Sequence, residues 1–280
     1  SYKTILIQNS FRSTQSDVFY KKEDLKKRNF KCDYILVFNK HVGKLYNEFL
    51  KGKVFQIGSF RSNSIRKKNL KKKYDILYVS RYKGNEDKEF FIKEHNITWA
   101  DVRLDEEKII EHLKNYIKTN RDINLFVLGC KIKNKQKEIK YWNEKLNDVK
   151  FTFLPQDKNR NTYQIIDETK VLISVDSSLG YESIARGNKI CVFSVHPDKY
   201  PMNSSKFGWP ANLNDKGFCW TNSVEYSEFK RVLEDTYAIS EKDYFMNKAK
   251  NIIPDQMIFD EDNKIFQKII KELGTGNVKN

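Results

Sequence analysis

The sequence is poor in the residues that build metal centres and disulfide frameworks. Its 280 residues include four histidines and four cysteines. The four cysteines have no metal-type spacing: Cys32, Cys130, Cys191 and Cys219. Three of them lie in or beside apolar runs. We interpret them as reduced, mostly buried thiols of a cytosolic protein. We interpret the four histidines as exposed polar residues: His41, His95, His112 and His196. The sequence therefore predicts no metal site.

Long apolar runs are also absent. No stretch of about 18 apolar residues occurs, and no basic segment followed by an apolar one opens the chain. We therefore predict neither a transmembrane helix nor a signal peptide, and we expect a cytoplasmic protein. With 39% hydrophobic and 14% aromatic residues, the chain can still bury one large core or two modest ones.

Acidic residues are the minority charge, with 37 Asp and Glu against 52 Lys and Arg, a net charge of +15. Clustered basic residues would indicate a nucleic-acid partner. Here the lysines are spread over nearly every polar segment, as an AT-rich coding sequence would produce, and only Arg61–Lys73 and Lys131–Lys140 are denser. We predict no nucleic-acid partner, and favour anionic sugar ligands or peripheral contact with an anionic inner membrane.

One stretch, Val171–Ser194, is the most informative part of the sequence. An apolar run to Val175 is followed by a turn at Asp176–Ser178, a helical segment to Gly187 and a second apolar run. This order predicts a strand, a short helix and a parallel strand, both strands being buried. Ser177 or Ser178 can cap the helix, and Gly187 fits the left-handed position after its end.

The start of this helix is predicted to bind an anion. Exposed N–H groups and the helix dipole favour negative charge there, and Ser177, Ser178 and Gly180 leave room for it. Glu182 is not explained as a cap, because a capping box would place its acid at Gly180 or Tyr181. Either Glu182 accepts hydrogen bonds from a ribose or sugar hydroxyl, or it is a solvated first-turn acid.

The remaining chain alternates between apolar strands and amphipathic helices. Strands are predicted at 4–8, 32–38, 54–60, 74–80, 123–129 and 149–154, and helices at 42–50, 106–118, 135–146, 163–168, 225–235, 241–251 and 260–273. The alternation over residues 74–194 predicts a doubly wound parallel α/β sheet. The segment before Arg103 has no assignable element, and the Gly-, Pro- and aromatic-rich loop after Ser194 is predicted to be packed.

The domain prediction follows from the same pattern. Residues 1–62 form a partial N-terminal Rossmann-like segment, 63–73 a basic linker, 74–250 a C-terminal Rossmann-like domain, and 251–280 a C-terminal helix and tail. Polar residues at the carboxyl end of the first strand, where open α/β sheets bind ligands, are candidate contacts: Gln8, Asn9, Arg12 and Asp17. A polar loop without a ligand-binding role would have the same sequence pattern.

Two separated motifs carry a family resemblance. Asp176–Gly187 together with Phe207–Pro210 resembles bacterial surface-carbohydrate biosynthesis proteins of GT-B glycosyltransferase architecture. Ile7–Arg12, Gly58–Asn63 and Ile76–Arg81 are similar to that family's segments in the same order, so the resemblance covers most of the chain. More distantly, the stretch resembles the Kdo transferases of capsule and lipopolysaccharide synthesis and the teichoic-acid glycerophosphotransferases, which use CMP-Kdo and CDP-glycerol.

The resemblance implies a nucleotide-sugar site between two Rossmann-like domains, with no metal and no cofactor. The donor phosphate would lie at the helix start and the ribose at Glu182; the implied donor-binding residues are Arg81, Lys131, Ser177, Ser178, Gly180, Tyr181 and Glu182. A glycan or lipid-linked acceptor would approach Gln8, Asn9 and Arg12. A catalytic carboxylate is sought among Asp17, Asp87 and Asp176, although Asp176 also fits a turn residue.

The short segment before the linker departs from the family pattern. A GT-B enzyme has two full Rossmann-like domains, and here only residues 1–62 precede the linker, so the N-terminal domain is predicted to be shortened. Three hypotheses therefore stand. The chain is a metal-independent glycosyltransferase that extends a bacterial surface polysaccharide or lipopolysaccharide; or it is a glycerophosphotransferase or nucleotide-sugar epimerase; or it is a noncatalytic nucleotide-sugar-binding module.

Overall fold

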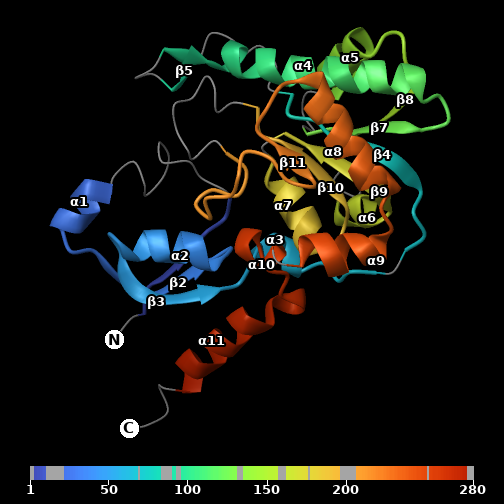
Figure 1. The fold of residues 1–280 in the computed structure, drawn as a ribbon. Coiled ribbons are helices and arrows are strands. Elements are labelled where there is room, and N and C mark those ends of the chain that lie inside the picture. Colours follow the sequence, from blue (N-terminus) through green and yellow to red (C-terminus); the bar gives the residue numbers. More distant parts are fainter. Residues whose placement is uncertain are drawn as a thin grey trace.

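Two parallel β-sheets form two lobes joined by two crossings of the chain (Figure 1). The computed structural model describes residues 3–10, 22–68, 70–82, 90–92, 96–130, 135–156, 162–175, 177–195, 206–250 and 252–275. Both sheets carry helices on their two faces, which confirms the predicted Rossmann-like α/β fold. Among the described residues, no helix combines the length and apolar character that a membrane crossing requires.

The first lobe is a three-stranded sheet in the order β1-β2-β3: β1 (Ile5–Ile7), β2 (Lys31–Val37) and β3 (Lys51–Gln56). Helix α1 (Lys22–Lys27) precedes β2, and α2 (Lys40–Asn47) follows it. Alternate residues of β2 point to opposite faces, so Ile35 and Val37 pack with α2 while Leu36 packs with Ile269 of the C-terminal helix α11 (Lys264–Thr275). The end of the chain therefore returns to cover its beginning.

The second lobe is a six-stranded parallel sheet in the order β11-β10-β9-β4-β7-β8. Its strands are β4 (Tyr74–Val79), β7 (Leu125–Leu128), β8 (Phe151–Leu154), β9 (Thr169–Ser174), β10 (Ile190–Phe193) and β11 (Trp220–Thr221). Its helices are α4 (Trp99–Thr119), α5 (Lys135–Lys145), α6 (Thr162–Asp167), α7 (Ser178–Ala185) and α8 (Tyr226–Ala238). A two-stranded antiparallel ribbon, β5 (Phe90–Ile92) and β6 (Ile97–Thr98), precedes α4.

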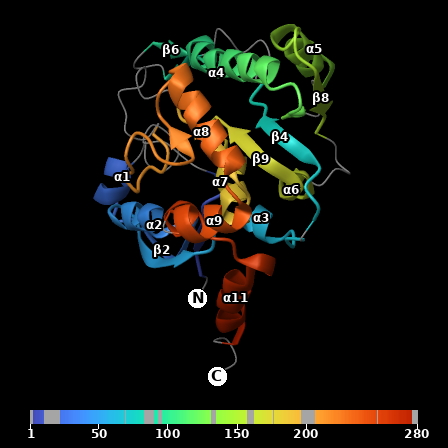
Figure 2. The same ribbon diagram turned by 45° about the vertical axis from the view of Figure 1, so that its right-hand side comes forward.

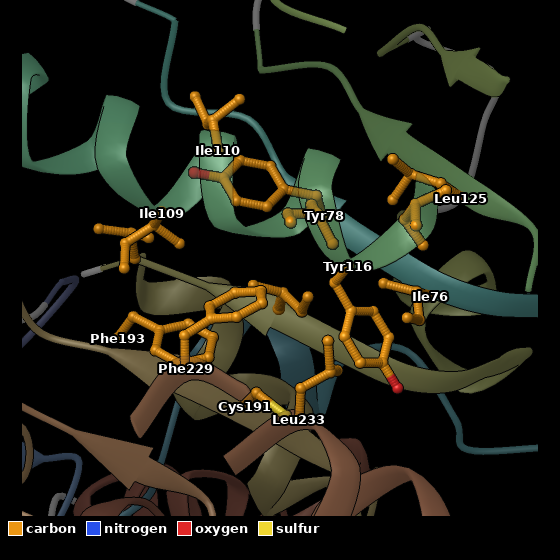
Figure 3. Close-up of a cluster of buried hydrophobic side chains, with 14 of the residues drawn as sticks. Ile76, Tyr78, Ile109, Ile110, Tyr116, Leu125, Cys191, Phe193, Phe229 and Leu233 are labelled. Carbon is orange, nitrogen blue, oxygen red and sulfur yellow. The ribbon is translucent and has the colours of Figure 1, made fainter. Parts of the chain in front are cut away.

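Each face of the large sheet has its own apolar core. Figure 3 shows the core between the sheet and helices α4 and α8, in which Ile109 and Phe229 meet side chains of the strands. The other face packs against α6, α7 and the loop that contains Phe207. Because both faces are covered, the central strands carry buried apolar runs rather than an alternating pattern, as the sequence indicated: Ile76–Val79, Val171–Ile173 and Ile190–Phe193.

Several predicted boundaries were wrong, each because a cap or a turn was missed. The strand expected at 54–60 ends at Gln56, since Gly58 turns the chain (φ 66°) and Ser59 caps a short helix, α3 (Phe60–Asn63). Helix α4 begins at Trp99 rather than 106, because Thr98 and Asp101 form a reciprocal capping box. The helix expected at 241–251 is α9 (Glu241–Asp243) continued by a π-helical turn (Tyr244–Ala249).

The last segment runs back to the first lobe through short elements. Helix α10 (Ile253–Gln256) and a 3₁₀ turn (Glu261–Asn263) precede α11, so the helix expected from Asp260 begins at Lys264. Asn63 joins the two crossings: its amide nitrogen donates to the Asn263 side-chain oxygen at 3.1 Å, and its oxygen accepts from the Asp260 N–H at 3.1 Å. Asn63 is 0% exposed, although it was assigned to the basic linker predicted at 63–73.

A buried arginine ties the same connection to the second lobe. Arg186, which ends α7, makes two hydrogen bonds to Asp167, and its side chain is 0% exposed. The guanidinium also donates to the carbonyl oxygens of Ser62 at 3.1 Å and Ile65 at 2.8 Å. The rings of Tyr163 and Phe259 lie against it. One guanidinium group therefore binds α7, α6 and the interlobe connection together.

We predict that Arg186→Ala lowers the free energy of unfolding by about 3–5 kcal/mol, because it leaves the buried Asp167 carboxylate without its charge partner. Urea unfolding followed by circular dichroism measures the change. Arg66→Ala is the matched control, since Arg66 pairs with Asp262 while its own side chain is 73% exposed, and such pairs contribute about 0–1 kcal/mol. Equal effects of the two substitutions would contradict the role assigned to Arg186.

Candidate functional site

A pocket lies between the lobes at the carboxyl ends of the strands. In the second lobe the strand order reverses between β4 and β9, and such switch points are where open α/β sheets bind ligands. A pocket of about 690 Å³ opens there. Its lining includes Ile7 to Asn9 from the first lobe, Ser59 to Arg61 from α3, and Ser177 to Leu179 from the start of α7.

Helix α7 lies between the large sheet and the first lobe in both views (Figure 1 and Figure 2). Ser177 is its N-cap, and the hydroxyl accepts from the Leu179 N–H at 3.3 Å. The Ser178 hydroxyl lies 3.2 Å from that of Ser10 in the first lobe. Gly180 is buried, and a Cβ there would meet the Ser174 hydroxyl at 2.7 Å, so this glycine makes room for β9 rather than for the pocket. Gly187 has the expected left-handed conformation, with φ 81°.

Glu182 lies one turn into α7 and lines the pocket. Its carboxylate accepts from the Ser59 hydroxyl at 2.5 Å and from the Tyr163 hydroxyl at 3.1 Å. Burial raises the pKa of Glu182, and these two hydrogen bonds together with the positive charges of Arg61 and Arg186 oppose the rise. The carboxyl group is thus held by two hydroxyls from separate elements. It is the one carboxylate among the described residues that line this pocket.

The two motifs that carry the resemblance pack against each other. Phe207 stacks on Tyr181 with ring centroids 5.3 Å apart, and the Gly208 N–H donates to the Tyr181 hydroxyl at 3.4 Å. Trp209 then packs against the core of the first lobe. Tyr181 is 8% exposed and lies outside the pocket lining. Tyr181 therefore holds the Phe207–Pro210 loop on the second lobe, while Trp209 of the same loop contacts the first lobe.

The acceptor-side residues divide into two kinds. Gln8 is buried, and its amide oxygen accepts from the Phe38 N–H at 2.9 Å while its amide nitrogen donates to the Ser10 carbonyl at 3.1 Å. Its side chain thus holds the ends of β1 and β2 together. Asn9 is exposed and lines the pocket.

The other predicted site residues are placed elsewhere or not described. Arg81 lies two residues beyond β4 and does not line the pocket, and its charge opposes the rise in the pKa of the buried Tyr78 hydroxyl. Five lie outside the described residues: Arg12, Asp17, Asp87, Lys131 and Asp176. The described part of the chain contains no group of three or more His, Cys, Asp or Glu residues arranged to hold a metal ion.

Three polar residues that surround Glu182 in the pocket are among those that sequence reasoning missed: Ser59, Arg61 and Tyr163. Ser59 follows Gly58 and precedes a helical turn, so its spacing is that of an N-cap, but the residues after it had been assigned to a strand. Tyr163 is the second residue of α6, the helix that precedes β9. Nothing local shows that these hydroxyls converge on Glu182, which is 123 and 19 residues away in the chain.

The fold resembles several solved structures of low sequence identity. The GtfA/B complex matches with a TM-score of 0.50 and 11% identity over 96% of this chain and 52% of that one. The wall teichoic acid polymerase TagF, solved with CDPG, matches with a TM-score of 0.51 and 13% identity over 99% and 66%. HepE from Anabaena, solved with UDP and glucose, matches with a TM-score of 0.51 and 8% identity over 96% and 71%. No curated protein sequence matches significantly.

These likenesses and the two facing parallel sheets define a protein of GT-B architecture, as predicted. The chain spans about half to two thirds of the length of GtfA/B and TagF. At the level of sequence, residues 5–274 match a family described as "putative O-antigen biosynthesis protein". The chain belongs to this family of O-antigen biosynthesis proteins, which confirms the predicted resemblance to surface-carbohydrate biosynthesis proteins.

The raised pKa of Glu182 predicts a pH-dependent stability. The folded protein keeps this proton to higher pH than the unfolded chain, so wild-type stability falls as pH rises from the ordinary value of 4.5 through the raised pKa. Glu182→Gln removes the titration, and its unfolding free energy relative to wild type should therefore increase across this window. Urea unfolding at a series of pH values measures the difference. Glu144→Gln, an exposed change on α5, is the control, and a pH-independent difference for Glu182→Gln would refute the prediction.

Proposed function

We propose that the protein is a glycosyltransferase that moves a sugar from a nucleotide-activated donor to a growing bacterial surface glycan. The observation that carries the proposal is the position of Glu182, whose carboxylate faces the interlobe pocket one turn after the start of α7. Membership in the O-antigen family and the GT-B architecture support this reading. Two proteins of this architecture have been solved with bound ligands, HepE with UDP and glucose and TagF with CDPG.

Glu182 has the capacity to bind the donor ribose. A carboxylate offers about four lone-pair positions, and the Ser59 and Tyr163 hydroxyls account for two of them. Two vicinal ribose hydroxyls would complete the set as charge-assisted hydrogen bonds. The donor phosphates would then lie at the start of α7, beside Ser177 and Ser178, where the helix dipole favours negative charge.

The same arrangement would stabilise the leaving nucleotide. Arg61 lines the pocket and could offset the charge that develops on the phosphate as the glycosidic bond breaks, together with the α7 dipole. The glycan or lipid-linked acceptor would enter from the first lobe, near Asn9 and the exposed side chains of Ile7 and Phe60. The proposal also includes metal independence and peripheral contact with an anionic membrane. It assigns the catalytic role to Asp17, Asp87 or Asp176.

The first test is nucleotide binding measured by calorimetry. CMP, CDP and UDP are titrated into the wild type and into Glu182→Ala. We expect saturable binding of one nucleotide by the wild type, weakened at least about tenfold by the substitution, because two charge-assisted hydrogen bonds to the ribose are lost. Glu144→Ala, which removes an exposed acid on α5, should bind as the wild type does.

Two outcomes would contradict the proposal. Absence of binding to well-folded wild-type protein would remove the donor site and leave the noncatalytic module as the better hypothesis. Binding that Glu182→Ala leaves unchanged would place the nucleotide elsewhere in the protein.

A second candidate reaction uses the same pocket. The likeness to TagF, solved with CDPG, favours transfer of a glycerophosphate group in place of a sugar. The two reactions leave different acceptors: phosphotransfer from a CDP-linked donor adds a glycerophosphate and releases CMP, whereas sugar transfer adds a sugar and releases a nucleoside mono- or diphosphate. Mass analysis of the acceptor after incubation with each donor separates them.

A further inference from the structure

A buried carboxylate lies beneath the pocket floor without lining the pocket. Glu138 of α5 is 0% exposed, and its Oε1 accepts from the Ser80 hydroxyl at 2.5 Å and from the Cys130 N–H at 2.9 Å. Ser80 directly follows β4, Cys130 lies two residues beyond β7, and both line the pocket. One carboxylate oxygen therefore joins the ends of two adjacent parallel strands.

The Ser80 hydroxyl has no freedom left to rotate. It donates its proton to Glu138 and accepts from the Trp142 indole N–H at 3.0 Å and from the Tyr82 N–H at 3.3 Å. A hydroxyl has one donor and two acceptor positions, so each is used. Trp142 lies one turn after Glu138 on the same helix, and the Cys130 thiol donates to the Tyr82 carbonyl at 3.1 Å. Helix α5 thereby fixes the turns after both strands.

We propose that Glu138 is a positioning residue for the donor, which holds the Ser80 and Cys130 turns in the one shape that the nucleotide-sugar meets. This inference rests on the proposed function of the pocket. A fully buried carboxylate is costly unless it is hydrogen-bonded, whereas an apolar side chain could fill the same space without that cost. Its hydrogen bonds go to two residues of the pocket floor, and bonds to an ionised acceptor are stronger than neutral ones.

The test compares Glu138→Gln, Ser80→Ala and the double variant by calorimetry with the nucleotide that the wild type binds. Glutamine keeps the shape but removes the charge, so we expect affinity to fall about fivefold. Ser80→Ala should have an effect of similar size. Because both residues act through one hydrogen-bonded network, the double variant should bind no more weakly than the weaker single variant. Glu144→Gln on the same helix is the matched control.

A purely structural carboxylate would give a different pattern. Thermal unfolding would show lower stability for Glu138→Gln, while the folded fraction would bind the nucleotide as the wild type does, and that result would overturn the inference. Additive losses in the double variant would also overturn it. If Glu138→Gln does not fold, the nucleotide affinity of Ser80→Ala is the test. An affinity equal to that of the wild type would show that the network does not position the donor. Absence of wild-type binding would instead overturn the proposed function, and this inference with it.

Discussion

The arrangement of the two lobes depends on the hydrogen bonds of the buried Arg186 guanidinium group. This group neutralises Asp167 inside the protein and is shielded from solvent. Its remaining N–H groups must therefore donate to acceptors of the protein. It finds them in the carbonyl groups of Ser62 and Ile65, in the connection between the lobes. Since Arg186 also ends α7, the helix that faces the pocket is fixed to the connection that places the first lobe opposite it.

Helix α7 thus combines three roles along a few turns. Its start faces the pocket at Ser177, its middle carries Glu182 against Ser59 and Tyr163, and its end is Arg186. The Phe207–Pro210 loop supports its far side through Tyr181 and reaches the first lobe through Trp209. The two motifs that carry the resemblance are therefore parts of one packed unit.

Two carboxyl groups near the pocket are held by hydrogen bonds in the same way. Glu182 is held by hydroxyl groups from α6 and from the N-cap of α3, and Glu138 by a hydroxyl and an N–H from two strand ends. A negative charge beside a site proposed for phosphates would be unfavourable if left bare, and hydrogen-bond donors lower that cost. In both cases the donors come from different elements, so each carboxylate also fixes how those elements lie relative to one another.

The sequence by itself determined the parallel α/β fold, the strand and helix at Val171–Gly187, a serine cap at Ser177 or Ser178 and the left-handed Gly187, because apolar periodicity and caps are properties of neighbouring residues. The structure places that cap at Ser177. It missed the ends of β3 and α4, where short caps compete with apolar patterning. Only the tertiary structure decided that Ser59 and Tyr163 meet Glu182, that Gln8 serves the backbone, and that α11 covers the first sheet. These contacts depend on strand order and on two crossings between lobes, which bring together residues far apart in the chain and leave no local pattern in it.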